Sequence, residues 1–123
     1  MEEETKIKTY RDLLVWQKSM KLVTEVYKNT QTFPNNELYG LVSQIRRCAV
    51  SIPSNIAEGY GRYSTNDYTR FLQIAIGSLF ELQTQLEISF NLNYLASEDF
   101  SSLYEKTREV ERMLSSMISK IKG

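Results

Sequence analysis

The stretch ELYGLVSQIRRCAVSIPSNIAEGYG, residues 37–61, decides how this chain folds. Apolar residues recur along it at intervals of three and four, which is the spacing of one face of an α-helix. They are Leu38, Leu41, Val42, Ile45, Ala49, Ile52 and Ile56. Pro53 removes one backbone donor inside this pattern, so we expect a single kinked helix over residues 37–60, with Ser51 or Ser54 relieving the break.

Amphipathic segments on either side predict three more helices, at about residues 12–30, 65–91 and 97–121. Asp12, Ser64 and Ser97 are the expected N-cap residues, and Asn91-Leu92-Asn93 ends the third helix because Asn tolerates the left-handed conformation. The expected inward residues are Leu13, Trp16, Met20, Val23 and Tyr27, then Tyr68, Phe71, Leu72, Ala75, Leu79, Leu82 and Leu86, and finally Phe100, Leu103, Thr107, Val110, Leu114, Met117 and Ile121. Four such helices on short connections predict an all-α fold, an antiparallel up-down four-helix bundle forming one domain over residues 1–123.

The composition offers few residues that are suited to catalysis or metal binding. The chain of 123 residues has one cysteine, Cys48, and no histidine, which removes the commonest general base and the usual zinc ligands. Phosphate-binding glycine motifs are absent. Glu58 and Glu81 could form a carboxylate pair, but acids paired with arginines are the better interpretation. We therefore predict a protein that is not an enzyme and has no cofactor or metal site.

The location is predicted from the same features. A single cysteine allows no intrachain disulfide and suits a reducing compartment. The polar N-terminal residues do not resemble a signal peptide, and no apolar run approaches the roughly 20 residues that span a bilayer. We expect a cytoplasmic protein with no membrane partner.

A polar stripe accompanies the apolar face of residues 37–60. Its members recur every three or four residues and are Gln44, Arg47, Ser51, Asn55, Glu58 and Arg62. The next helix carries Gly77, Ser78 and Glu81. Because a glycine within a helix costs about 1 kcal/mol relative to alanine, Gly77 indicates close approach of another backbone. Two alternatives stay open, a hydrogen-bonded layer within one bundle and an interface between subunits. The predicted interface residues are Gln44, Ser51, Asn55, Glu58, Gly77, Ser78 and Glu81.

Several separate motifs together resemble one family. They are residues 11–20 (RDLLVWQKSM), residues 37–47 (ELYGLVSQIRR), residues 51–59 (SIPSNIAEG), and Arg70-Phe71-Leu72 with Gly77-Ser78 and Glu81-Leu82. In this order they resemble the bacterial four-helix-bundle proteins encoded within 23S rRNA intervening sequences. That family is similar to the accessory variability protein of diversity-generating retroelements. The resemblance implies a barrel-like homopentamer, with basic surfaces that in the retroelement branch engage nucleic acid and a reverse transcriptase.

The basic residues are unevenly distributed, although the net charge is zero. A local basic face can bind a polyanion even in a neutral chain. The leading hypothesis is a homo-oligomer that binds structured RNA or other nucleic acid through Arg46, Arg47 and Arg62, helped by Lys18 and Lys21. Ion pairing is the alternative for each, and for Arg47 we favour it. A second hypothesis is a protein-interaction scaffold that uses Tyr10, Tyr39, Tyr60 and Tyr63, since tyrosine is enriched at interfaces.

Overall fold

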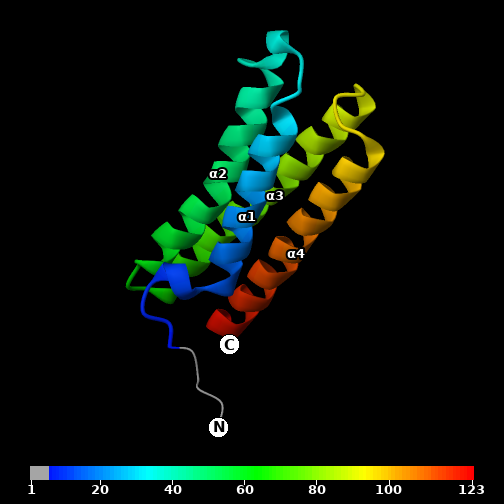
Figure 1. Ribbon diagram of the computed structural model, residues 1–123. Coiled ribbons are helices and arrows are strands. Elements are labelled where there is room, and N and C mark those ends of the chain that lie inside the picture. The colour runs from blue at the N-terminus through cyan, green and yellow to red at the C-terminus, as the bar shows by residue number, and fades with distance from the viewer. Residues whose placement is uncertain (1–5) are drawn as a thin grey trace.

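The computed structural model describes residues 6–123, and these form four α-helices with no strand among them (Figure 1). The helices are α1 (Leu14–Thr30), α2 (Leu41–Tyr60), α3 (Thr65–Asn91) and α4 (Ser97–Lys122). Short 3-10 turns at Tyr10–Asp12 (η1) and Asn35–Glu37 (η2) precede α1 and α2. Residues 1–5, which the predicted domain includes, lie outside the described part. No helix within residues 6–123 combines the length and the apolar character needed to cross a membrane.

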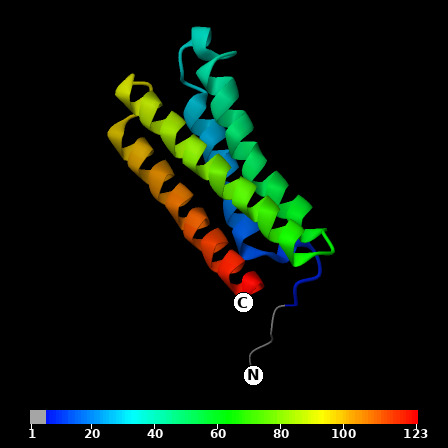
Figure 2. The same cartoon turned by 180° about the vertical axis from the view of Figure 1, so that it is seen from behind.

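The four helices pack in a closed ring around one core. Each of α1 and α3 contacts both α2 and α4. Viewed from behind, α3 runs between α2 and α4 (Figure 2). The connections α1–α2 and α3–α4 lie at one end, and the α2–α3 connection lies at the other (Figure 1). The largest fully buried side chains are Leu22, Ile45, Ile52, Ile56, Leu72, Leu79, Leu82, Leu86, Leu103 and Leu114.

The inward face of α1 differs from the predicted one. Met20 and Tyr27 are 41% and 39% exposed, whereas Leu22 and Val26 are buried. The true face includes Ser19, which sequence periodicity does not recognise as a core residue. Its hydroxyl donates to the carbonyl of Trp16 at 2.8 Å, so the buried polar atom has a partner. A second apolar stripe, from Leu13 to Tyr27, therefore lies at the edge of the core.

Two predicted helix starts are wrong, by two residues for α1 and by four for α2, and two predicted N-caps are wrong. Asp12 does not cap α1: its carboxylate accepts from the backbone N–H groups of Lys8 (2.9 Å) and Thr9 (3.1 Å), which lowers the pKa of Asp12. α4 begins at residue 97, as predicted, but its N-cap is Ala96 rather than Ser97. α2 begins at Leu41 rather than at residue 37, because η2 and a turn occupy residues 35–40.

Other local predictions are confirmed. The Ser64 hydroxyl accepts from the backbone N–H of Asp67 at 3.1 Å and caps α3. Asn93 has a φ of 63° after the end of α3. α2 is one helix through Pro53, and the Asn55 side chain donates to the Ser51 carbonyl at 2.7 Å within that turn.

The end of the bundle that carries the α1–α2 and α3–α4 connections is held together by a contact that the sequence did not reveal. The Tyr94 hydroxyl donates to Glu37 Oε2 at 3.0 Å, and this bond raises the pKa of Tyr94. The other carboxylate oxygen of Glu37 accepts from the backbone N–H of Leu41 at 3.4 Å. Glu37 therefore links the first turn of α2 to the α3–α4 connection.

Gly59 lies at a close contact between α2 and α3. A Cβ at this buried position would lie 2.8 Å from Phe71 Cβ and 3.2 Å from Tyr68 Cδ1. No relaxed pair of carbon atoms is that close, so a side chain at position 59 would push the two helices apart.

We expect Gly59→Ala to lower the thermal unfolding midpoint. Overpacking costs about 1–3 kcal/mol, which exceeds the gain of up to about 1 kcal/mol in helix propensity. Circular dichroism melting measures the change. Gly61→Ala is the matched control, since a Cβ there is an ordinary 3.6 Å from the Glu58 carbonyl oxygen. A Gly59→Ala midpoint equal to that of the parent protein would contradict the tight contact.

Candidate nucleic-acid interface

A groove of about 530 Å³ runs along the first half of α2, where α2 meets the end of α1. It is lined by Tyr27, Leu38, Tyr39, Val42, Ser43, Arg46, Arg47 and Val50. We call it the arginine groove. It combines two adjacent basic residues with two tyrosines and an apolar floor.

Arg46 is held in place by the last turn of α1. Its Nε donates to Thr30 Oγ1 at 3.0 Å, and an Nη donates to the Tyr27 carbonyl at 3.4 Å. The guanidinium carbon lies 4.6 Å from the centre of the Tyr27 ring, in cation–π contact. Arg46 thus satisfies a carbonyl at a helix end and keeps its charge at the wall of the groove.

Arg47 has no such restraint. It is exposed, and within residues 6–123 it forms neither a hydrogen bond nor an ion pair. The ion pair that we favoured for Arg47 is therefore not formed within the described chain. Arg47 also borders a second groove of about 400 Å³ between α2 and α3, lined by Gln44, Arg47, Cys48, Ser51, Ser78 and Glu81.

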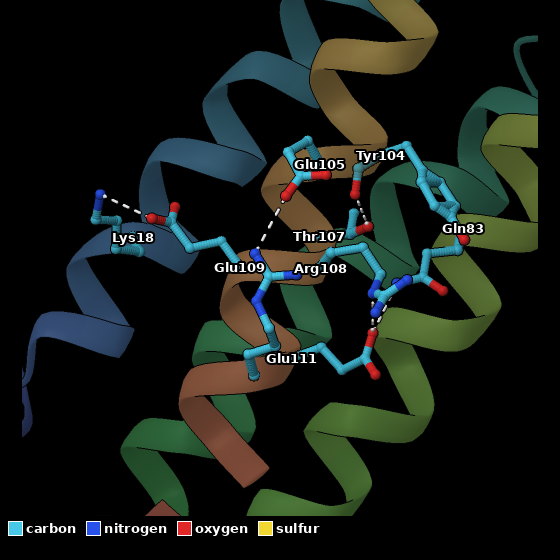
Figure 3. Close-up of polar contacts among 9 residues, drawn as sticks. Lys18, Gln83, Tyr104, Glu105, Thr107, Arg108, Glu109 and Glu111 are labelled. Carbon is cyan, nitrogen blue, oxygen red and sulfur yellow. Dashed lines mark hydrogen bonds and ion pairs between the residues drawn. The ribbon is translucent and has the colours of Figure 1, made fainter. Parts of the chain in front are cut away.

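The other three predicted basic residues lie elsewhere. Lys18 Nζ is 3.4 Å from Glu109 Oε2, beside a row of polar contacts along α4 (Figure 3). Lys21 lies on α1, as Lys18 does, and is exposed. Arg62 follows the C-terminal end of α2, and its guanidinium is 4.6 Å from the centre of the Phe71 ring. Of the five predicted basic residues, only Arg46 and Arg47, which are neighbours in the sequence, line one groove together.

Lys18 lies beside a row of polar contacts on α4 and has an ion-pair partner there, whereas Arg47 has none in the described part of the chain. Glu111 accepts from Gln83 Nε2 of α3 at 3.2 Å and pairs with Arg108 Nε at 3.3 Å. Arg112 pairs with Glu105 at 3.1 Å. Within these pairs acids and bases neutralise each other, and each exposed pair contributes at most about 1 kcal/mol to stability.

The polar stripe is divided between two roles. The hydroxyls of Ser51 and Ser78 share a hydrogen bond at 2.7 Å across the α2–α3 contact, and Cys48 Sγ donates to the Ser78 carbonyl at 2.9 Å. Ser51, Ser78 and Asn55 therefore contribute to a hydrogen-bonded layer within one bundle. Of the predicted interface residues, Gln44, Glu58, Gly77 and Glu81 are exposed instead.

Cys48 is buried, as its place on the apolar side of α2 indicated. Burial, with a smaller effect from the Glu81 charge, raises the pKa of the Cys48 thiol to about 12. The thiol therefore stays protonated and is a poor nucleophile at neutral pH. Among residues 6–123, no group of three or more Cys, Asp or Glu side chains is placed to hold a metal ion.

Sequence reasoning did not find the arginine groove as a unit. Tyr27 was assigned to the core, and Tyr39 was not connected with the arginines. A usable signal was the recurrence of Tyr39, Ser43, Arg46 and Val50 at intervals of three and four, which places them on one side of α2 and its preceding turn.

Comparisons with known proteins agree on one family. The chain is similar to a crystallised protein of unknown function from the S23 ribosomal protein family of Bacteroides thetaiotaomicron. The two are 26% identical, the match covers 85% of this chain and 98% of that one, and the TM-score is 0.78. Among curated proteins, none matches significantly. Residues 11–116 match the family model described as 23S rRNA-intervening sequence protein. Because that match spans most of the chain, this protein belongs to the 23S rRNA-intervening sequence protein family.

Proposed function

We propose that this protein is a non-enzymatic, cytoplasmic homo-oligomer that binds RNA or another nucleic acid through the arginine groove. The observation that carries the proposal is the pair of neighbouring arginines, Arg46 and Arg47, neither of which is neutralised by an acid within residues 6–123. Phosphate contacts dominate the affinity of proteins for nucleic acids, and arginine forms them well because of its planar, fork-shaped array of donors.

The charges support Arg46 and Arg47 over the other candidates. Lys18 has a partner in Glu109, so phosphate binding there would first break an ion pair. Lys21 and Arg62 are exposed and stand apart from the groove, where they would add secondary contacts. Because only a few residues contribute in each chain, useful affinity requires several chains acting together.

An exposed face of α3 supports the oligomer. Ile74, Phe80 and Ile88 are exposed, and Gly77 lies among them at helical spacing. A Cβ at Gly77 would meet nothing within 4 Å, so no contact within residues 6–123 requires this glycine. We propose that an antiparallel up-down bundle assembles through this face into a barrel-like homopentamer. A neighbouring subunit would then cover the apolar residues and approach Gly77 closely.

Arg47→Gln should weaken nucleic-acid binding without unfolding the protein. Fluorescence anisotropy with a labelled rRNA fragment, across a series of salt concentrations, measures this effect. We expect lower affinity and a salt dependence shallower by about one unit of logarithmic slope for each phosphate that the variant no longer binds. The matched control is Arg70→Gln, because Arg70 is equally cationic and exposed but already pairs with Asp67 at 3.7 Å. Equal effects of the two substitutions would refute the assignment to Arg47.

Gly77→Ala distinguishes an oligomer interface from a free surface. In an isolated chain the change should stabilise α3 by up to about 1 kcal/mol, since the added methyl meets open space. At a subunit interface the same methyl should reduce assembly. Light scattering after size exclusion gives the molar mass in units of the 14.3 kDa chain. We expect an oligomeric parent protein and a smaller species for Gly77→Ala. A monomeric parent with a more stable variant would disprove the interface.

A protein-interaction scaffold is the second candidate, and one observation favours it. Tyr39 and Tyr63 project from opposite ends of α2, at 93% and full exposure. Tyr10 and Tyr60, the other two predicted contact residues, instead pack edge-on against Trp16 and Tyr68. If no nucleic acid binds even at low salt, the scaffold becomes the leading function.

A further inference from the structure

The arginine groove has more apolar surface than phosphate binding requires. Tyr27, Leu38, Tyr39 and Val50 are all exposed on it, and Tyr39 is 93% exposed. Single exposed apolar residues are normal, but several in one groove indicate a surface that a ligand covers. Its volume of about 530 Å³ lies within the range of about 300–1,000 Å³ that is typical of ligand sites.

The cationic part of the groove is already arranged. Stacking on Tyr27 and the bonds to Thr30 and the Tyr27 carbonyl fix the Arg46 guanidinium. These two bonds use only some of its N–H donors, so others are free to receive an anion. The guanidinium lies over the Tyr27 ring, so a cationic plane and an aromatic ring stack at the groove wall. Arg47, the next residue, adds a second and unrestrained positive charge.

A ligand that uses the whole groove needs both an anionic group and a flat apolar face. Duplex nucleic acid offers phosphates, but its base faces are stacked inside the helix. An unpaired nucleotide offers a phosphate and a free base face together. Tyrosine rings and arginine planes are the surfaces on which unpaired bases stack. An acidic peptide matches the charge but not the flat surfaces.

We infer that the arginine groove takes unpaired nucleotides, with a base stacked on Tyr39 and its phosphate bound by Arg46 and Arg47. The inference rests on the proposed function and narrows it from nucleic acid in general to single-stranded segments. Tyr39 supplies base stacking and the arginines supply the salt-dependent attraction. Binding of this kind depends little on sequence, since every base has a face to stack.

The test compares one single-stranded and one double-stranded probe on the full chain. The probes are a fluorescein-labelled oligouridylate of about twelve nucleotides and a mixed-sequence RNA duplex of the same length, titrated by anisotropy. The variants are Tyr39→Ala, which removes the ring, and Tyr39→Phe, which keeps it. Tyr63→Ala is the control, because Tyr63 is fully exposed near the opposite end of α2 and outside the groove.

We expect the single strand to bind more tightly than the duplex. Tyr39→Ala should weaken single-strand binding about tenfold, the typical effect of removing one stacking partner. Tyr63→Ala should bind like the parent protein, Tyr39→Phe should retain single-strand binding because it keeps the ring, and Tyr39→Ala should weaken single-strand binding more than duplex binding.

The contrary outcomes separate this inference from the proposed function. If the duplex binds as well as the single strand, with Arg47→Gln weakening both and Tyr39→Ala weakening neither, nucleic-acid binding stands and the stacking site is refuted. If neither probe binds at low salt, both proposals fail. Tight binding of an acidic peptide, such as a glutamate-rich peptide with one tryptophan, in the absence of RNA binding would assign the groove to a protein partner and overturn both.

Discussion

The contact between α2 and α3 fixes the orientation of α2, and with it the position of the arginine groove. Gly59 allows the two backbones to approach at one end, and the shared hydrogen bond of Ser51 and Ser78 joins them near the middle. Between these points Ile52 and Leu72 are fully buried. Rotation of α2 about its own axis would break this contact. The side of α2 that carries Arg46 and Arg47 therefore has a fixed orientation in the bundle. The arginine groove is a consequence of core packing.

The charged side chains differ between the two sides of the bundle: several on the α4 side form ion pairs, whereas Arg46 and Arg47 on α2 do not pair with any described residue. On the α4 side, acids and bases pair along and between helices, as Lys18 with Glu109 and Arg112 with Glu105. On the α2 side, Arg46 is bound to backbone and hydroxyl oxygens and Arg47 to nothing within residues 6–123. A chain with a net charge of zero can therefore present a local positive field. Neutralised pairs do not attract phosphate, so the neutral total and the proposed binding are compatible.

The fold could be predicted largely from periodicity, and the failures have a common cause. The buried face of α4, Leu103, Thr107, Val110 and Leu114, follows the predicted spacing. The face of α1 was misjudged because its buried side includes Ser19 and Thr30, whose hydroxyls bond to carbonyls in their own helix. Helix starts were misplaced where a polar residue bonded elsewhere, as Asp12 did in the turn before α1. At Ser19, Thr30 and Asp12, short-range hydrogen bonding outweighed the simple polarity pattern.

The sequence by itself determined that four amphipathic helices form and roughly where they begin and end, because these follow from local spacing and residue type. Only the tertiary structure decided which basic residues have a partner on another helix and which line a groove. Arg46, Arg47, Arg62, Lys18 and Lys21 are equivalent as positive charges in the sequence. Packing paired Lys18 with Glu109, stacked Arg62 on Phe71, and left Arg46 and Arg47 in one groove with Tyr39. The distance between side chains on different helices depends on how the helices are rotated in the bundle, and that rotation is set by the whole core.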